Sequence, residues 1–164
     1  MAFGKFGRYH PDGVDVRLAE VDLVALLRAE TDAIAAAHPS RDVHFSADAA
    51  RFVSKTDALH VRYVAVNLLQ NALKYSAPDS KVEVDLRTGP GSAALTVRDR
   101  GIGIPNGELE KLFSPFYRAS NVGALPGTGM GLAIVKKSAS LVGARVDVET
   151  APGEGTAFTV VFPA

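Results

Sequence analysis

The chain lacks several features that would each point to a class of protein. It has no cysteine among its 164 residues, which excludes disulfide frameworks and thiolate metal sites and agrees with a reducing compartment. Its 18 Lys and Arg equal its 18 Asp and Glu, so no overall field favours nucleic acid or an anionic membrane as a partner. No apolar run approaches the ~20 residues of a membrane span, and the N-terminus lacks the apolar centre of a secretory signal. These absences predict a soluble, cytoplasmic, globular domain.

The length and patterning indicate one domain with a substantial core. Hydrophobic residues make up 47% of the chain, and a chain of this size is too short for two comfortable domains. Residues 1–14 show no clear period, and we interpret them as a linker or the remnant of an upstream region. The domain itself is expected over residues 15–164. We find no internal repeat and no low-complexity tract.

Hydrophobic periodicity predicts three helices interleaved with strands. The helices are expected over residues 20–37, 57–75 and 131–142. The strands are expected over residues 43–45, 51–54, 81–87, 93–99, 145–149 and 156–162. Residues 100–127, rich in glycine and proline, are too long for an ordinary connection and are interpreted as a functional lid. The arrangement predicts an α/β fold with one mixed sheet and helices packed on one face.

Polar residues form a stripe on the second predicted helix. At ~100° per residue, Asn67, Asn71 and Lys74 fall within roughly 60° of one another, beside the apolar face. Amide oxygens suit Mg²⁺, which also binds substrate phosphates, and a lysine one turn further on can balance phosphate charge. Tyr75 offers a flat face to a base. A solvated helix face with no ligand explains the same spacing equally well.

A carboxylate stands at the end of an apolar strand. Leu95, Val97 and Asp99 share one face of a strand, so Asp99 occupies an inward position where burial is costly unless the carboxylate is hydrogen-bonded. An adenine amine would satisfy it. Alternatively, the strand has ended and Asp99 caps the following turn. Gly101 and Gly103 allow the chain to pass close to a flat ligand.

A glycine-rich run, Gly127 to Gly131, leads directly into the last predicted helix. Helix N-termini expose free N–H groups that bind anions, and glycines let phosphate approach them. Many glycine-rich turns share this pattern. The run lies too late in the chain for a dinucleotide-binding fold, and no P-loop sequence is present.

Together the three stretches resemble the N, G1 and G2 boxes of the ATP-binding catalytic domain of bacterial sensor histidine kinases. They read NLLQNALKY (Asn67–Tyr75), DRGIGIP (Asp99–Pro105) and GTGMGL (Gly127–Leu132). Between the last two, LFSPFYR (Leu112–Arg118) is similar to the F box of that family. The resemblance covers residue 16 to the end. It implies a two-layer fold with a mixed, mostly antiparallel sheet, about three helices on one face and a long ATP lid.

The resemblance implies a role for each matching residue. Asn71 would be the main Mg²⁺ ligand with Asn67 assisting, Lys74 would contact phosphate, Tyr75 would pack on the adenine, and Asp99 would accept from its amine.

Other matching residues would complete the ATP site. The residues beside the base would be Gly101, Gly103 and Ile104, with Thr156 from the terminal strand. The residues that hinge the lid and line the phosphates would be Gly127, Thr128, Gly129, Met130, Gly131 and Leu132. Arg118 would reach the phosphates when the lid closes, and Phe113 and Phe116 would clamp the lid to the body.

One position favours a kinase over an ATPase. ATPases of this superfamily carry a glutamate one turn before the metal asparagine, where it activates water; here that position is Asn67. An amide cannot act as a general base, so transfer to another acceptor is favoured over hydrolysis.

The acceptor expected for such a kinase is a histidine on a separate dimerising helical hairpin. None of His10, His38, His44 and His60 fits its motif, and each is expected at the surface. The acceptor module is therefore expected outside this chain. The chain by itself is expected to be monomeric and to form part of a homodimeric parent protein that can be membrane-anchored. It is expected to serve a response regulator indirectly.

Three alternatives stay open on sequence grounds. The fold also serves ATPases in which ATP drives lid closure and dimerisation, non-catalytic binding modules, and serine kinases of the anti-sigma type, whose N box carries an acid where Asn67 stands.

Overall fold

The computed structural model of the chain describes residues 8–9 and 13–164. The linker predicted over residues 1–14 therefore lies largely outside the described residues, as does His10. Within them, a short strand β1 (Arg8–Tyr9) pairs antiparallel with β2 (Asp15–Val16). A second pair, β3 (Ala19–Asp22) with β5 (Val53–Thr56), is also antiparallel. These pairs lead the chain into the main layers.

The main sheet has five strands in the order β4-β6-β7-β9-β8. Strand β4 runs parallel to β6, and the other neighbours are antiparallel. The strands are β4 (Asp42–Ala47), β6 (Lys81–Gly89), β7 (Ser92–Asp99), β8 (Arg145–Ala151) and β9 (Gly155–Pro163). The prediction of a mixed, mostly antiparallel sheet is confirmed.

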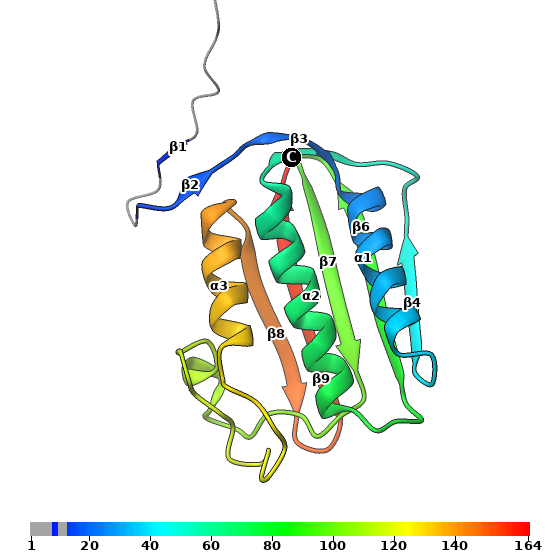
Figure 1. Ribbon diagram of the computed structural model, residues 1–164, viewed down its shortest axis with the longest axis vertical. Helices are drawn as coiled ribbons and strands as arrows, with labels where there is room; N and C mark the ends of the chain where they lie inside the picture. The colour runs from blue at the N-terminus through cyan, green and yellow to red at the C-terminus, as the bar shows by residue number, and fades with distance from the viewer. Residues whose placement is uncertain (1–7, 10–12) are drawn as a thin grey trace, which may run out of the picture.

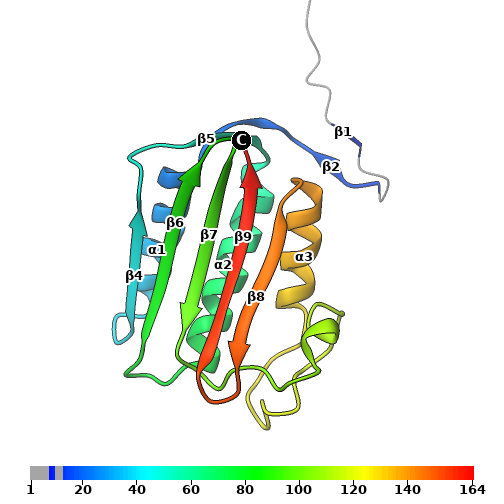
Figure 2. The same ribbon diagram turned by 180° about the vertical axis from the view of Figure 1, so that it is seen from behind.

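Among the described residues, three helices cover one face of this sheet, and none lies on the other face (Figures 1 and 2). They are α1 (Leu23–Ala37), α2 (Ala58–Tyr75) and α3 (Gly131–Leu141). A single turn of 3₁₀-helix, η1 (Leu109–Lys111), lies within the long loop between β7 and α3. The two-layer architecture is therefore confirmed. Among the described residues, no helix has the length and apolar character needed to cross a membrane.

The first helix begins later than its hydrophobic pattern predicts. The prediction started at residue 20, but Glu20 lies in β3, and Asp22 caps α1 by accepting a 3.1 Å hydrogen bond from the Val24 N–H. The pairing of β3 with β5 holds this segment extended, and periodicity within one segment carries no signal of that pairing.

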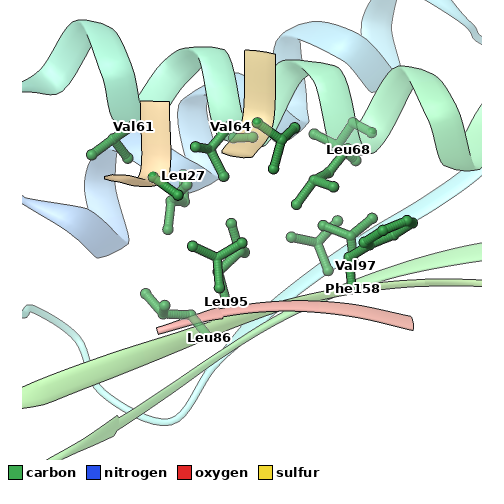
Figure 3. Packing of buried hydrophobic residues seen from close by; sticks show 14 of the residues in the cluster. Leu27, Val61, Val64, Leu68, Leu86, Leu95, Val97 and Phe158 are labelled. Atoms are coloured by element: carbon green, nitrogen blue, oxygen red, sulfur yellow. The ribbon is translucent and has the colours of Figure 1, made fainter. Parts of the chain in front are cut away.

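The core lies between α2 and the sheet (Figure 3). Val61, Val64 and Leu68 point from α2 toward Leu95 and Val97 on β7, and each of the five is at most 1% exposed. Burying side chains of this size contributes ~1.5–3 kcal/mol each. This packing fixes the rotation of α2 about its axis, and hence the direction of its polar stripe.

The expectation that every histidine lies at the surface is wrong for His60. His38 and His44 are exposed, whereas His60 is 8% exposed. Its Nδ1 lies 3.4 Å from the Ser138 Oγ on α3, and its ring packs edge-on against Tyr63. Because α3 packs beside α2, it covers the side of α2 that carries His60. The sequence pattern of α2 alone predicts an exposed polar edge there.

Candidate functional site

The carboxyl ends of α2 and β7 and the start of α3 meet at one end of the molecule, at the bottom of Figure 1. There they surround a cavity of about 350 Å³, which the long loop and β9 complete. The predicted site residues that line it are Asn67, Asn71, Lys74, Tyr75, Asp99, Gly103, Ile104, Arg118, Gly127, Thr128, Gly129, Gly131, Leu132 and Thr156. Those that do not line it are Gly101, Phe113, Phe116 and Met130.

The α2 stripe directs two amide oxygens toward the start of α3. The Asn67 Nδ2 donates to the Tyr63 carbonyl one turn back, at 2.7 Å, which leaves its Oδ1 free to face the cavity. A Cβ placed on Gly131 would lie 3.4 Å from the Asn67 Oδ1 and 3.9 Å from the Asn71 Oδ1. Both oxygens therefore converge on the first residue of α3.

This arrangement fits a magnesium ion shared with a phosphate ligand. The described residues contain no group of three or more His, Cys, Asp or Glu that could hold a metal. Magnesium, however, commonly takes one or two protein oxygens and completes its shell with waters and phosphate oxygens. The Asn67 and Asn71 oxygens supply hard ligands of that kind on the cavity wall.

The start of α3 offers N–H groups to an anion. Gly131 is the first residue of α3, and the side chain of Met130 just before it makes no capping hydrogen bond. The first N–H groups of a helix lack intrahelical acceptors, and the helix dipole favours an anion there. Gly129 just before it has φ +74°, and a Cβ at that position would collide with the backbone of Phe116 and Tyr117. Glycine is therefore needed where the lid meets the helix.

Lys74, in the last turn of α2, places a positive charge near the start of the glycine run. Its Nζ lies 5.1 Å from the centre of the Tyr75 ring, and it lies against Gly127, where any Cβ would displace it. The ammonium group thus stands between the aromatic ring and the glycine run, on the cavity wall.

Asp99 lines the cavity at the end of β7. It is 8% exposed, and its Oδ1 accepts a 2.8 Å hydrogen bond from the Gly101 N–H. Burial raises the pKa of this carboxyl, and backbone hydrogen bonds from Gly101 and Thr156 partly offset that rise. The two sequence interpretations therefore coexist: Asp99 caps the turn after β7 and also faces the cavity.

The glycines after Asp99 let the loop pass close to two other segments. A Cβ on Gly101 would overlap the Tyr75 carbonyl oxygen, and a Cβ on Gly103, which has φ +68°, would overlap the Ala151 carbonyl. Gly101 therefore shapes the site from behind, since it does not line the cavity itself. The next residue, Ile104, is 8% exposed and adds an apolar wall.

Hydrogen bonds within the lid tie its second half to its first half. The Glu108 carboxylate accepts from the Ser120 N–H at 3.2–3.3 Å, and hydrogen bonding by Ser120 holds the pKa of Glu108 below its ordinary value. The Asn121 Nδ2 donates to the Gly103 carbonyl at 2.9 Å. Arg118 lines the cavity and donates to the Leu125 carbonyl within the lid.

The two lid phenylalanines differ in their packing. Phe113 packs edge-on against Phe158 of β9, with ring centres 6.3 Å apart, so it anchors the lid to the body. Phe116 is 73% exposed and has φ +65°, and its N–H donates to the Gly129 carbonyl at 3.1 Å. In this arrangement the Phe116 side chain does not clamp the lid; its backbone ties the F-box segment to the glycine run.

Several lining residues were missed from the sequence. They are Gln70, Ile102, Leu112, Tyr117, Ala119, Asn121, Val122 and Phe158. Gln70 stands one turn after Asn67, so helical spacing could have indicated it. Asn121 lies in an irregular loop with no period, and no local signal identifies it.

The chain is similar to a family model and to several known proteins. The family described as "Histidine kinase-, DNA gyrase B-, and HSP90-like ATPase" matches residues 56–164. The chain is 36% identical over 152 residues to the sensor histidine kinase YkoH of Bacillus subtilis, covering 92% of this chain and 33% of the relative. It is 42% identical over 127 residues to the signal transduction histidine-protein kinase/phosphatase MprB of Mycobacterium avium, covering 74% of this chain and 24% of the relative.

A solved structure shows the same architecture. The mycobacterial sensor histidine kinase MprB superposes with a TM-score of 0.80 at 29% identity, covering 88% of this chain and 97% of that one. The chain spans a third or less of the length of the two curated relatives.

Proposed function

Because the chain belongs to the family of histidine kinase-, DNA gyrase B- and HSP90-like ATPases, we propose that it binds Mg-ATP and donates the γ-phosphate to a histidine. That histidine would lie on a separate dimerisation and phosphoacceptor module, outside this chain, within a two-component signalling protein. Through it the domain would serve a response regulator indirectly. No nucleic acid takes part in this proposal, and the domain would work in the cytoplasm, as a monomer when isolated.

The observation that carries the proposal is that two chemically different sets of groups line one cavity. A buried carboxylate, Asp99, suits an amine-bearing base and would form the adenine end. Two amide oxygens, Lys74 and the start of α3 suit a metal-bound polyphosphate and would form the phosphate end. A ligand with a base at one end and phosphates at the other matches both.

Each cavity residue would act by binding and orienting. The Asp99 carboxylate would accept from the adenine amine, and the Tyr75 ring would cover the base. Asn71, assisted by Asn67, would hold the ion, which supplies neutralisation of phosphate charge when bound. Lys74 and the N–H groups of α3 would stabilise the negative charge of the transferring group. Catalysis would thus rest on positioning and charge rather than on a covalent intermediate.

Asn67 favours transfer over hydrolysis in this proposal. Its amide has no basic atom to remove a proton from water, and its Nδ2 is already bound to the Tyr63 carbonyl. Among the described histidines, none lines the cavity, and in this proposal the acceptor comes from a separate module. The remainder of the parent protein would supply it as a homodimeric hairpin.

A two-stage experiment tests the proposal. Calorimetry with ATP, with and without Mg²⁺, should show binding that Mg²⁺ strengthens. Labelled ATP should then leave the isolated chain unlabelled but label an added histidine-bearing hairpin, and a hairpin with its histidine replaced by glutamine should stay unlabelled. Rapid ATP turnover by the chain alone would favour an ATPase, and failure to bind any nucleotide would favour a binding module; either result contradicts the proposal.

A further inference from the structure

We infer that Arg41, which lies outside every nucleotide-binding motif, is a positioning residue for the adenine end of the cavity. The inference rests on the proposed function and adds a residue to it. Arg41 precedes β4 and is half-buried. It does not line the cavity, so it would act through the residues that it holds.

The guanidinium group binds the carboxyl end of α2. Its Nη1 donates to the Leu73 carbonyl at 2.7 Å, and its Nη2 donates to the Ser76 Oγ at 2.6 Å and the Ala77 carbonyl at 3.2 Å. The Ser76 Oγ in turn donates to the Ala72 carbonyl. Arg41 therefore links the last turn of α2 to the residues just after that helix. All of these partners lie more than 30 positions after Arg41 in the sequence.

This turn carries Tyr75, which would cover the adenine, and Lys74, which would contact phosphate. Helix carbonyls in the last turn lack intrahelical donors. Here three different segments supply donors to them. Ser76 binds the Ala72 carbonyl, Arg41 binds the Leu73 carbonyl, and the Ile102 N–H binds the Tyr75 carbonyl at 3.2 Å. The ring of Tyr75 and the ammonium of Lys74 project from this same turn into the cavity wall.

The same turn also holds the loop after Asp99. Ser76 forms an antiparallel bridge with Gly101, and a Cβ on Gly101 would overlap the Tyr75 carbonyl. The Gly101 N–H donates to the Asp99 Oδ1. A displacement of the α2 end therefore moves the loop that orients the Asp99 carboxylate, so both walls of the adenine end depend on one cation.

Arginine suits this position better than lysine. Its planar group supplies several donors in fixed directions, whereas an ammonium is a single flexible point of charge. A cation at a helix C-terminus also interacts favourably with the helix dipole. The Nε of Arg41 is buried without a partner in the described structure, so its contribution comes from the two terminal nitrogens.

The test compares Arg41→Met and Arg41→Lys with a matched control, Arg51→Met. Arg51 is exposed and makes no side-chain hydrogen bond or ion pair with the described residues. We expect Arg41→Met to weaken Mg-ATP binding by roughly tenfold, because the loss of one well-placed hydrogen bond to a charged group is worth about a tenfold change in affinity. Arg41→Lys should fall between it and the unchanged protein, and Arg51→Met should bind normally.

Hydrogen exchange separates positioning from general destabilisation. The Ile102 amide should exchange faster in both Arg41 variants, while amides paired between β7 and β9 keep their protection. In the transfer assay, KM for ATP should rise with kcat nearly unchanged. Unchanged affinity and unchanged Ile102 exchange in Arg41→Met would overturn the inference, as would a uniform rise in exchange across the chain. Should Arg41→Met fail to fold, Arg41→Lys supplies the same comparison.

The two proposals fail in different ways. If the unchanged protein binds no Mg-ATP, the proposed function is wrong regardless of Arg41. If it binds Mg-ATP and the Arg41 variants bind equally well, only the positioning role is wrong.

Discussion

Replacing Asp99 by asparagine removes the negative charge of this side chain and keeps its size and shape, so the variant tests the role of the charge in binding adenine. The Asp99 side chain is 8% exposed, and its Oδ1 accepts from the Gly101 N–H at 2.8 Å. An asparagine Oδ1 can accept the same bond, so the turn after β7 should survive. Its NH₂ group, however, can only donate, and the adenine amine also donates. Asp99→Asn should therefore keep the fold and lose nucleotide.

The size of the loss follows from the bond that disappears. A hydrogen bond to a charged group contributes ~1.5–3 kcal/mol, and each ~1.4 kcal/mol is a tenfold change in affinity. Asp99→Asn should therefore weaken Mg-ATP binding roughly 10- to 150-fold.

The stability of the variant should move the other way. Because burial raises the pKa of Asp99, the folded protein holds this proton more tightly than the unfolded chain does. The free energy of unfolding then falls as pH rises from the ordinary to the raised pKa, and the loss stays in full above it. Asparagine does not ionise, so the variant should be at least as stable at pH 7 and should lose this pH dependence. Nucleotide affinity of the unchanged protein should instead fall as pH drops through the raised pKa.

Calorimetric titration with Mg-ATP and urea unfolding at several pH values measure the two effects separately. Asp32→Asn is a suitable control, because Asp32 is an exposed residue of α1 and does not line the cavity. Unchanged affinity in Asp99→Asn would refute the assignment of the adenine end. A large loss of stability would refute the assigned cost of burying the charge.

Four further changes test other parts of the site and the fold. Asn71→Ala should remove the Mg²⁺-dependent part of ATP affinity and leave metal-free binding nearly unchanged, as measured by titration with and without Mg²⁺; equal loss in both would contradict a metal role. Asn67→Glu should raise ATP hydrolysis by the isolated chain, measured as phosphate release, because a carboxylate can serve as a base for water. The Glu108 carboxylate should hold the lid at pH 7 and release it as pH falls from the ordinary pKa of a glutamate through the lowered pKa of Glu108. The Ser120 amide should then exchange its hydrogen faster. In Glu108→Gln the Ser120 amide should exchange faster at pH 7 as well. Leu68→Ala should lower the free energy of unfolding by ~2–5 kcal/mol, since Leu68 is fully buried against the sheet; a loss under ~1 kcal/mol would show a poorly packed core.

Local sequence determined most of the secondary structure of this protein. The polar stripe of α2 was predictable because Asn67, Asn71 and Lys74 are separated by about one turn each, and the apolar side of the helix decides which way that stripe faces. The end of β7 at Asp99 and the start of α3 at Gly131 were predictable for the same reason, since both depend on a few neighbouring residues. The cavity forms where these three ends meet.

The places where prediction failed share a different cause. Glu20 extends a strand because β5 pairs with β3, and His60 is buried because α3 covers one side of α2. Phe116 is exposed although the F-box resemblance implies a clamp. In each case the outcome depends on how segments distant in sequence pack, so no period or spacing near the residue indicates it.

The sequence by itself determined the fold class and the three motifs, because helix faces, strand alternation and glycine-rich turns follow from interactions within a few residues. Tertiary structure alone decided that the Asn67 and Asn71 oxygens converge on Gly131, that Asn121 ties the lid to Gly103, and that Arg41 holds the end of α2. Such contacts form only after the layers pack, because that packing brings together donors and acceptors from distant parts of the chain.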